Sequence, residues 1–70
     1  MPDETTCEIH VRDVLDEKWA VFFTPFILTF REDETILTGT VHDQAELFGV
    51  LLKIRDSGLT LVALMPVLSQ

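Results

Sequence analysis

Apolar side chains recur along this chain with two different periods, and these periods predict where its strands and helices lie. Residues 7–12 alternate apolar and polar side chains, which is the period of a half-buried strand. Residues 26–30 and 35–41 repeat this pattern on either side of a charged turn at 31–34, as in a hairpin. Gly39 lies inside the second of these strands, where we expect it to mark a bulge in preference to a close approach by a neighbour.

The strongest helical pattern spans residues 43–59. Asp43 and Glu46 have the spacing of a capping box, with Asp in the usual Ser or Thr position. Gly58 followed by Leu59 is typical of a helix end, where glycine takes the left-handed conformation and the next apolar residue folds back. Apolar residues between these signals form one stripe that should pack on a sheet: Leu47, Val50, Leu51 and Ile54.

The segment at residues 16–23 fits two structures. Asp16 suits a helix N-cap, and Trp19, Phe22 and Phe23 would then share one side of a short helix. The same aromatic and β-branched residues also suit a strand. We favour the helix, and Pro25 ends either element because the residue before proline avoids the helical region.

The last strand is expected at residues 60–67, where nearly every side chain is apolar. Such a run predicts burial on both faces, and Pro66 places the strand at a sheet edge or ends it there. The element order is then β-α-β-β-α-β. This order predicts a ferredoxin-like α+β sandwich with a four-stranded, mainly antiparallel sheet and both helices on one face. If residues 16–23 are extended, the alternative is a three-stranded meander followed by α-β.

Composition narrows the kinds of partner. The chain has 70 residues, which we divide into a disordered lead-in at 1–6 and one domain at 7–68. Its net charge of -7, from 12 acidic and 5 basic residues, disfavours nucleic acid and anionic membrane surfaces. The acidic first residues do not resemble a signal peptide, so we expect a cytoplasmic protein.

The chain has too few cysteines and histidines for a disulfide or a zinc site to stabilise the fold. Cys7 is the only cysteine, which excludes an intrachain disulfide, and two histidines far apart make a poor zinc set. We therefore expect no metal and no cofactor. A domain this small has a marginal core, burying roughly 60% of its unfolded surface, so oligomerisation is the remaining source of stability.

Surplus apolar residues point to a homodimer, or to a contact with another protein. The candidate contact surfaces are the open sheet face and the edge of the last strand. Phe48 and Leu52 lie beside the core stripe of the main helix, and Gln44 and Arg55 would border them. The candidate interface residues are Gln44, Phe48, Leu52, Arg55, Val62 and Leu64.

The polar face of the first strand is the second candidate site. It carries an acid, an imidazole and a guanidinium, namely Glu8, His10 and Arg12. These groups could bind an anion or transfer a proton. The competing interpretation, which we favour, is an ordinary solvated sheet face with cross-strand charge pairs. His42 next to Asp43 is better explained by helix capping than by a catalytic couple, because the two side chains need not face each other.

The block from Thr35 to Leu61 reads T-x-L-T-G, then D-Q-A-x-L-x-G-x-L-x-x-I-R-D-x-G-L-x-L. This pattern resembles a family of short bacterial and archaeal proteins that is uncharacterised, so the resemblance implies no activity. The step from helix to strand at residues 56–59 is also similar, at the level of the fold, to ACT-type regulatory domains.

Three functions follow as expectations. The favoured one is a non-enzymatic homodimeric interaction or regulatory module. The second is a small-ligand sensor of ACT-like type, binding an anion or amino acid near His10, Arg12 and the Thr-rich strand. The third is a small enzyme working from the polar strand face, which we set lowest because no nucleophile with its base is visible.

Overall fold

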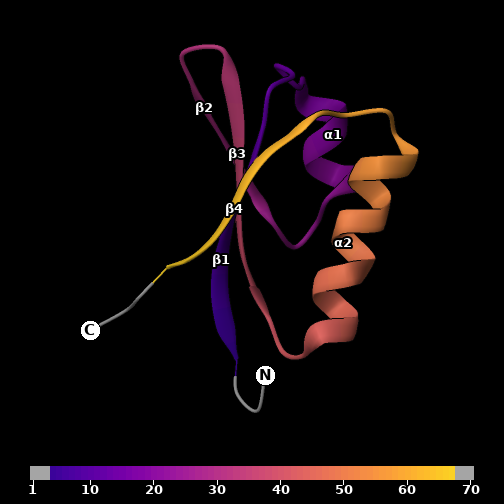
Figure 1. Ribbon diagram of the computed structural model, residues 1–70. Coiled ribbons are helices and arrows are strands. Elements are labelled where there is room, and N and C mark those ends of the chain that lie inside the picture. The colour runs from indigo at the N-terminus through magenta and orange to yellow at the C-terminus, as the bar shows by residue number, and fades with distance from the viewer. Residues whose placement is uncertain (1–3, 68–70) are drawn as a thin grey trace.

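The strands form one four-stranded sheet, and both helices cover the same face of it (Figure 1). The computed structural model describes residues 4–67. In chain order the elements are β1 (Thr5–Val11), α1 (Glu17–Phe22), β2 (Ile27–Arg31), β3 (Glu34–Val41), α2 (Gln44–Asp56) and β4 (Leu61–Val67). This is the predicted β-α-β-β-α-β order, and it makes the chain an α+β domain.

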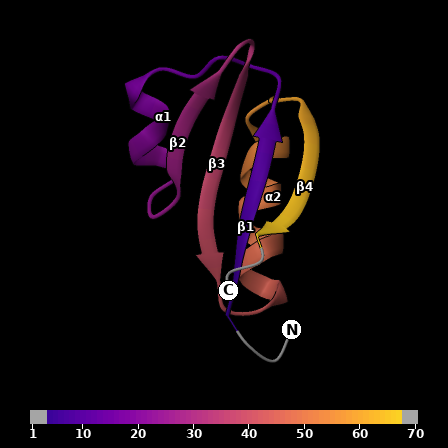
Figure 2. The same cartoon turned by 90° about the vertical axis from the view of Figure 1, so that its left-hand side faces the viewer.

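The strand order across the sheet is β2-β3-β1-β4, and all three pairings are antiparallel. The ferredoxin-like arrangement is therefore confirmed, and the meander alternative is wrong because β3 pairs with β1 as well as with β2. Figure 2 shows α1 beside β2, while α2 lies behind β1 and β4. The two edges of the sheet are β2 and β4.

The ambiguous segment is a helix, as favoured. The Asp16 side chain accepts a hydrogen bond from the backbone N–H of Lys18 at 3.1 Å, which caps α1. The Trp19 ring stacks on Phe23 at 5.9 Å between centroids, and Phe23 is only 1% exposed. Phe22 lies further out, with its ring edge toward both neighbours. A strand would send Phe22 and Phe23 to opposite faces, whereas the helix lets all three aromatic rings meet.

The predicted start and end of α2 are both present. Asp43 Oδ1 accepts from the Glu46 N–H at 2.9 Å, and Gly58 takes a φ of +77°. The Leu59 N–H then donates to the Ile54 carbonyl at 3.2 Å, which closes the last turn. The second hydrogen bond of the capping box differs from the usual one. The Glu46 side chain accepts from the backbone N–H of His42 at 2.6 Å, whereas the usual donor is the N–H of the N-cap residue, here Asp43.

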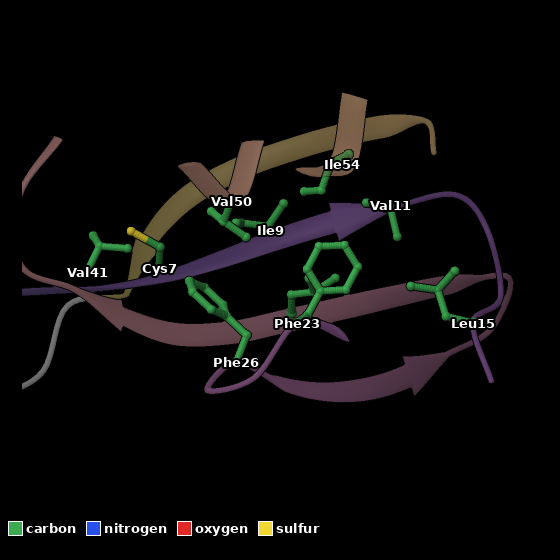
Figure 3. Close-up of a cluster of buried hydrophobic side chains, with 10 residues drawn as sticks. Cys7, Ile9, Val11, Leu15, Phe23, Phe26, Val41, Val50 and Ile54 are labelled. Atoms are coloured by element: carbon green, nitrogen blue, oxygen red, sulfur yellow. The ribbon is translucent and has the colours of Figure 1, made fainter. Parts of the chain in front are cut away.

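The core lies between the sheet and the helices and draws residues from every element except β4 (Figure 3). Val50 and Ile54 of α2 are buried against the apolar face of β1, where Ile9 is fully buried. Leu47 and Leu51 pack on this cluster while remaining partly exposed, so the predicted stripe of α2 is confirmed. Together these contacts fix the position of α2 on the sheet.

Two boundary and backbone predictions need correction. β1 begins at Thr5, so the predicted lead-in is two residues too long at its C-terminal end; residues 1–3 lie outside the described part. Gly39 is not in a bulge, because the β1–β3 register passes through the Cys7–Gly39 pair without a shift. A Cβ at Gly39 would lie 2.7 Å from the Phe26 ring, so the glycine permits a close approach.

The prediction for the last strand was half wrong. β4 lies at the sheet edge, as Pro66 suggested, but it is not buried on both faces. The pairing of β4 with β1 has one register shift: His10 pairs with Ala63 and Val11 pairs with Leu61, so Val62 has no partner residue in the register. Leu61 and Leu64 consequently pair with inward-facing residues of β1 and point to the helix side, yet they remain 47% and 39% exposed. Its apolar character therefore does not come from burial within one chain.

Candidate functional site

The polar strip on the open sheet face is held together by His10. Its Nδ1 lies 3.1 Å from Glu34 Oε1 and its Nε2 lies 3.2 Å from Glu8 Oε1. The hydrogen bond to Glu34 is the main reason that the pKa of His10 is raised above its usual value; burial opposes this rise, and the hydrogen bond to Glu8 adds a smaller rise. When it is protonated, the ring bridges two acids from two adjacent strands, Glu8 of β1 and Glu34 of β3.

Arg12 does not join this strip. It follows the last residue of β1, and its backbone N–H donates to the Thr60 carbonyl at 2.9 Å. The structure therefore brings Glu8 and His10 together as predicted, but supplies Glu34 of β3 where the sequence suggested an arginine. An acid–imidazolium–acid strip has a net negative charge, which disfavours the anion suggested for this face.

His42, at the junction of β3 and α2, has a similar environment. Its Nδ1 lies 2.9 Å from Glu46 Oε1 and its Nε2 lies 2.9 Å from Glu4 Oε2. The hydrogen bond to Glu46 is the main reason that the pKa of His42 is raised. In turn the backbone N–H of His42 lowers the pKa of Glu46. Asp43 caps α2 and does not orient His42, in agreement with the capping interpretation.

Cys7 and the acidic residues offer little reactive chemistry. The Cys7 thiol faces the core and its pKa is raised by burial, so the thiolate is disfavoured. Within residues 4–67, no three His, Cys, Asp or Glu side chains are grouped to hold a metal ion.

An apolar surface runs along the β4 side of the molecule. Phe48 and Leu52 of α2 are 55% and 47% exposed. Lys53 contacts Phe22 of α1, so the opposite flank of α2 faces away from α1 and toward the β4 side of the sheet (Figure 2). All the interface residues proposed from the sequence are exposed, and they lie on α2 and on β4. We call this surface the edge surface: Gln44, Phe48, Leu52, Arg55, Leu61, Val62 and Leu64.

A cleft of about 310 Å³ opens on the other flank of α2. Its floor comes from the core, and Figure 3 shows the Phe23 and Phe26 rings lying below Val50 of α2. Gly49 lies on the helix side of the cleft. The remaining lining residues are polar or lie at the mouth: Thr24, Pro25, Thr40, His42, Glu46 and Lys53, with Val41 completing the floor.

A comparison with protein families assigns the chain. A family model described as Domain of unknown function (DUF8691) matches residues 6–65. The chain belongs to this family. No curated protein and no solved structure matches it. DUF8691 has no assigned activity, which agrees with the expected kinship to an uncharacterised family, while the T-x-L-T-G pattern and the ACT likeness stay predictions. Over the described part of this DUF8691 domain, no helix has the length and apolar character needed to cross a membrane.

The sequence did not predict the cleft of this DUF8691 domain. Phe23 and Phe26 are buried core residues as well as lining residues of the cleft, so their apolar character alone does not indicate a site. The available signal was Gly49, a glycine in the interior of a 13-residue helix, far from either cap. Such a residue weakens the helix, and core packing does not account for it.

Proposed function

We propose that the domain is a non-enzymatic interaction module that forms a homodimer through the edge surface. The observation that carries this proposal is the exposed apolar strand β4 at the sheet edge. A strand of this kind presents unpaired backbone groups and apolar side chains together, and proteins cover such an edge or blunt it. Here the flank of α2 that carries Phe48 extends the apolar area beyond the strand itself.

Charge favours a second copy as the occupant. Each chain carries a net charge of -7, so two copies repel each other wherever their acidic surfaces meet. Residues 57–70 contain no Asp, Glu, Lys or Arg, and β4 lies within this stretch. Two copies can approach there without placing one acid against another. The open sheet face is less suitable, because it carries the Glu8–His10–Glu34 strip.

The size of the surface is adequate for a dimer. A standard interface removes about 800 Å² from each partner. That is roughly one sixth of the 4893 Å² that this chain exposes. β4 alone carries four large apolar side chains that are exposed: Leu61, Val62, Leu64 and Met65. A two-fold arrangement would bring the same strand from each copy to the centre of the contact.

The absence of catalysis is part of the proposal and rests on the histidines. Both ring nitrogens of His10, and both of His42, face carboxylates. A general base needs a nitrogen free to accept a proton from a substrate or nucleophile. These rings are instead stabilised in the protonated form. Cys7 lies on the opposite face of β1 from His10, so the two cannot form a nucleophile–base pair.

Charge-introducing variants on the two sheet edges test the dimer. Leu64→Glu places an acid on β4, and Phe48→Glu places one on the adjoining flank of α2. Ile27→Glu is the matched control, because Ile27 is 69% exposed on the other edge strand, β2. Sedimentation velocity should give a dimer for the unmodified chain and for Ile27→Glu, and monomers for Leu64→Glu and Phe48→Glu. Dimers in both of these variants, or a monomer only in Ile27→Glu, would place the contact elsewhere.

A further inference from the structure

The structure explains why glycine is needed at two of the three glycine positions in the chain. At the third position, no contact or backbone angle within the described part of the chain requires glycine. Gly39 is required because a Cβ there would lie 2.7 Å from the Phe26 ring. Gly58 is required because its φ of +77° is strained for any residue with a side chain. Gly49 has helical backbone, and a Cβ built on it would meet nothing within 4 Å. Alanine there would fit and would stabilise the helix by about 1 kcal/mol.

The space above Gly49 is the cleft. Gly49 and Val50 line it from α2, and the Phe23 and Phe26 rings with Val41 form its apolar floor. Gly49 borders this space with backbone alone, and a Cβ built there meets no other atom within 4 Å. A glycine where a backbone must come close to a bound molecule is a recurrent use of this residue. The missing side chain at Gly49 thus provides room and does not relieve a clash.

Lys53 is a cation at the mouth that has no acidic partner in the described part of the chain. The nearby Glu4–His42–Glu46 group has a net negative charge when His42 is protonated, so an anion would pair with Lys53 and not with His42. The Lys53 Nζ donates to the Phe22 carbonyl at 3.2 Å and lies 5.2 Å from the Phe22 ring centroid, and both of these partners are neutral. Within residues 4–67 Lys53 takes part in no ion pair. The neighbouring Glu46 is already engaged, because its Oε1 accepts from both the backbone and the ring of His42.

We propose that the cleft binds a small amphipathic carboxylate, whose apolar body packs against Phe23, Phe26 and the open backbone at Gly49 while its carboxylate pairs with Lys53. The volume of about 310 Å³ is at the small end of ligand sites, so the body is a single ring or a branched chain. Lys53 follows Gly49 by one helical turn, which places its ammonium on the same flank of α2. This flank is opposite the edge surface, so the inference is independent of the dimer.

Three probes that share one ring and differ in charge separate the parts of this proposal. Phenylacetate, 2-phenylethanol and 2-phenylethylamine are titrated into the ¹⁵N-labelled full chain, and amide shifts are followed. Phenylacetate should shift the amides of Gly49 and Val50 saturably, with a Kd of about 1 mM, as expected for a ligand of this size. The amine should bind about tenfold more weakly or not at all. Equal binding of acid and amine would refute the carboxylate assignment.

Two variants test the location. Gly49→Leu fills the cleft and should abolish binding, whereas Gln44→Leu places the same side chain at an exposed position on the opposite flank of the same helix and should leave binding unchanged. Thermal melts of both variants confirm that each is folded. Full affinity in Gly49→Leu, or no saturable cleft shift with any of the three probes, would overturn the proposal.

A third variant tests the counterion. Lys53→Gln should weaken phenylacetate about tenfold and leave 2-phenylethanol unchanged, because only the charged contact is lost. A parallel loss for both probes would show that Lys53 shapes the cleft without pairing with the carboxylate. An unchanged affinity for phenylacetate would remove Lys53 from the site altogether.

Discussion

The same substitution, glycine to alanine, should change stability in opposite directions at Gly39 and Gly49. At Gly39 the new Cβ would lie 2.7 Å from Cγ and Cδ2 of Phe26. The Cγ atom is the root of the ring, so rotating the ring about its own axis cannot relieve the contact, and Phe26 is buried. Overpacking of this kind costs about 1–3 kcal/mol, from which about 0.5–1 kcal/mol is recovered by removing a strand glycine. We expect a net loss of about 1–2 kcal/mol.

At Gly49 no steric contact opposes the increase in helix stability that alanine provides. The position is inside a 13-residue helix with open space around it, so Gly49→Ala should add about 1 kcal/mol. A domain of this size shifts its melting temperature by about 4–8 °C per kcal/mol. The two variants should therefore melt roughly 8 °C or more apart.

Thermal and urea unfolding at one fixed protein concentration measure this difference, because a dimer's stability depends on concentration. A double-mutant cycle with Phe26→Leu identifies the cause at Gly39. In the Phe26→Leu background, Gly39→Ala should lose most of its cost. If both glycine variants shift stability in the same direction, or if the cost at Gly39 is unchanged in that background, the assignment of the two glycines is wrong.

Two further predictions concern buried and bridging polar groups. The buried Thr35 hydroxyl donates to the Asp13 carbonyl at 2.7 Å and accepts from the Leu15 N–H at 3.1 Å. Thr35→Val removes both hydrogen bonds and should lower the free energy of unfolding in urea by about 1–3 kcal/mol, whereas Thr35→Ser should retain most of the stability. Equal losses in both variants would exclude the hydroxyl as the cause. His10 has a pKa raised by its two acids, so its contribution is complete below the unfolded value of about 6.5 and is lost as pH rises through the raised folded pKa. The stability difference between the unmodified chain and His10→Gln should therefore shrink over that range, and a difference independent of pH would contradict the bridge to Glu8 and Glu34.

The elements that the sequence predicted well are those with short-range signals. The cap at Asp43, the stop at Gly58 and the stripe through Val50 and Ile54 depend on residues within one or two turns of each other, and all of them are present. The polar alternation of β1 is equally local, and it identified the open face of the sheet. The position of β4 at the edge followed from Pro66, which cannot donate to a sheet ladder.

The features that could not be predicted depend on pairs far apart in the chain. The approach of Phe26 to Gly39 and the bridge from His10 to Glu34 both require the strand register, which no local pattern specifies. The run of apolar residues in β4 fits a buried strand and an exposed edge equally well. The cleft could not be predicted for the same reason, because its floor and Lys53 come from different parts of the chain.

The two flanks of α2 would serve two different purposes in this account. One flank, with Phe48 and Leu52, adjoins β4 in the proposed dimer contact, and the other, with Gly49 and Lys53, lines the proposed ligand cleft. The helix is one rigid element, and its core stripe joins both flanks to the same sheet. Binding at either flank therefore stabilises the same packing of α2 on β1, as ligand linkage requires.

The molar mass of the unmodified protein is the most direct test of the central claim. Light scattering coupled to size-exclusion chromatography should give the mass of two 8.0 kDa chains across the micromolar range. Dissociation on dilution should occur without unfolding, since the core of each chain is complete within one copy. A mass of one chain at every concentration would contradict the account, because the edge surface would then be exposed in solution without the partner proposed for it.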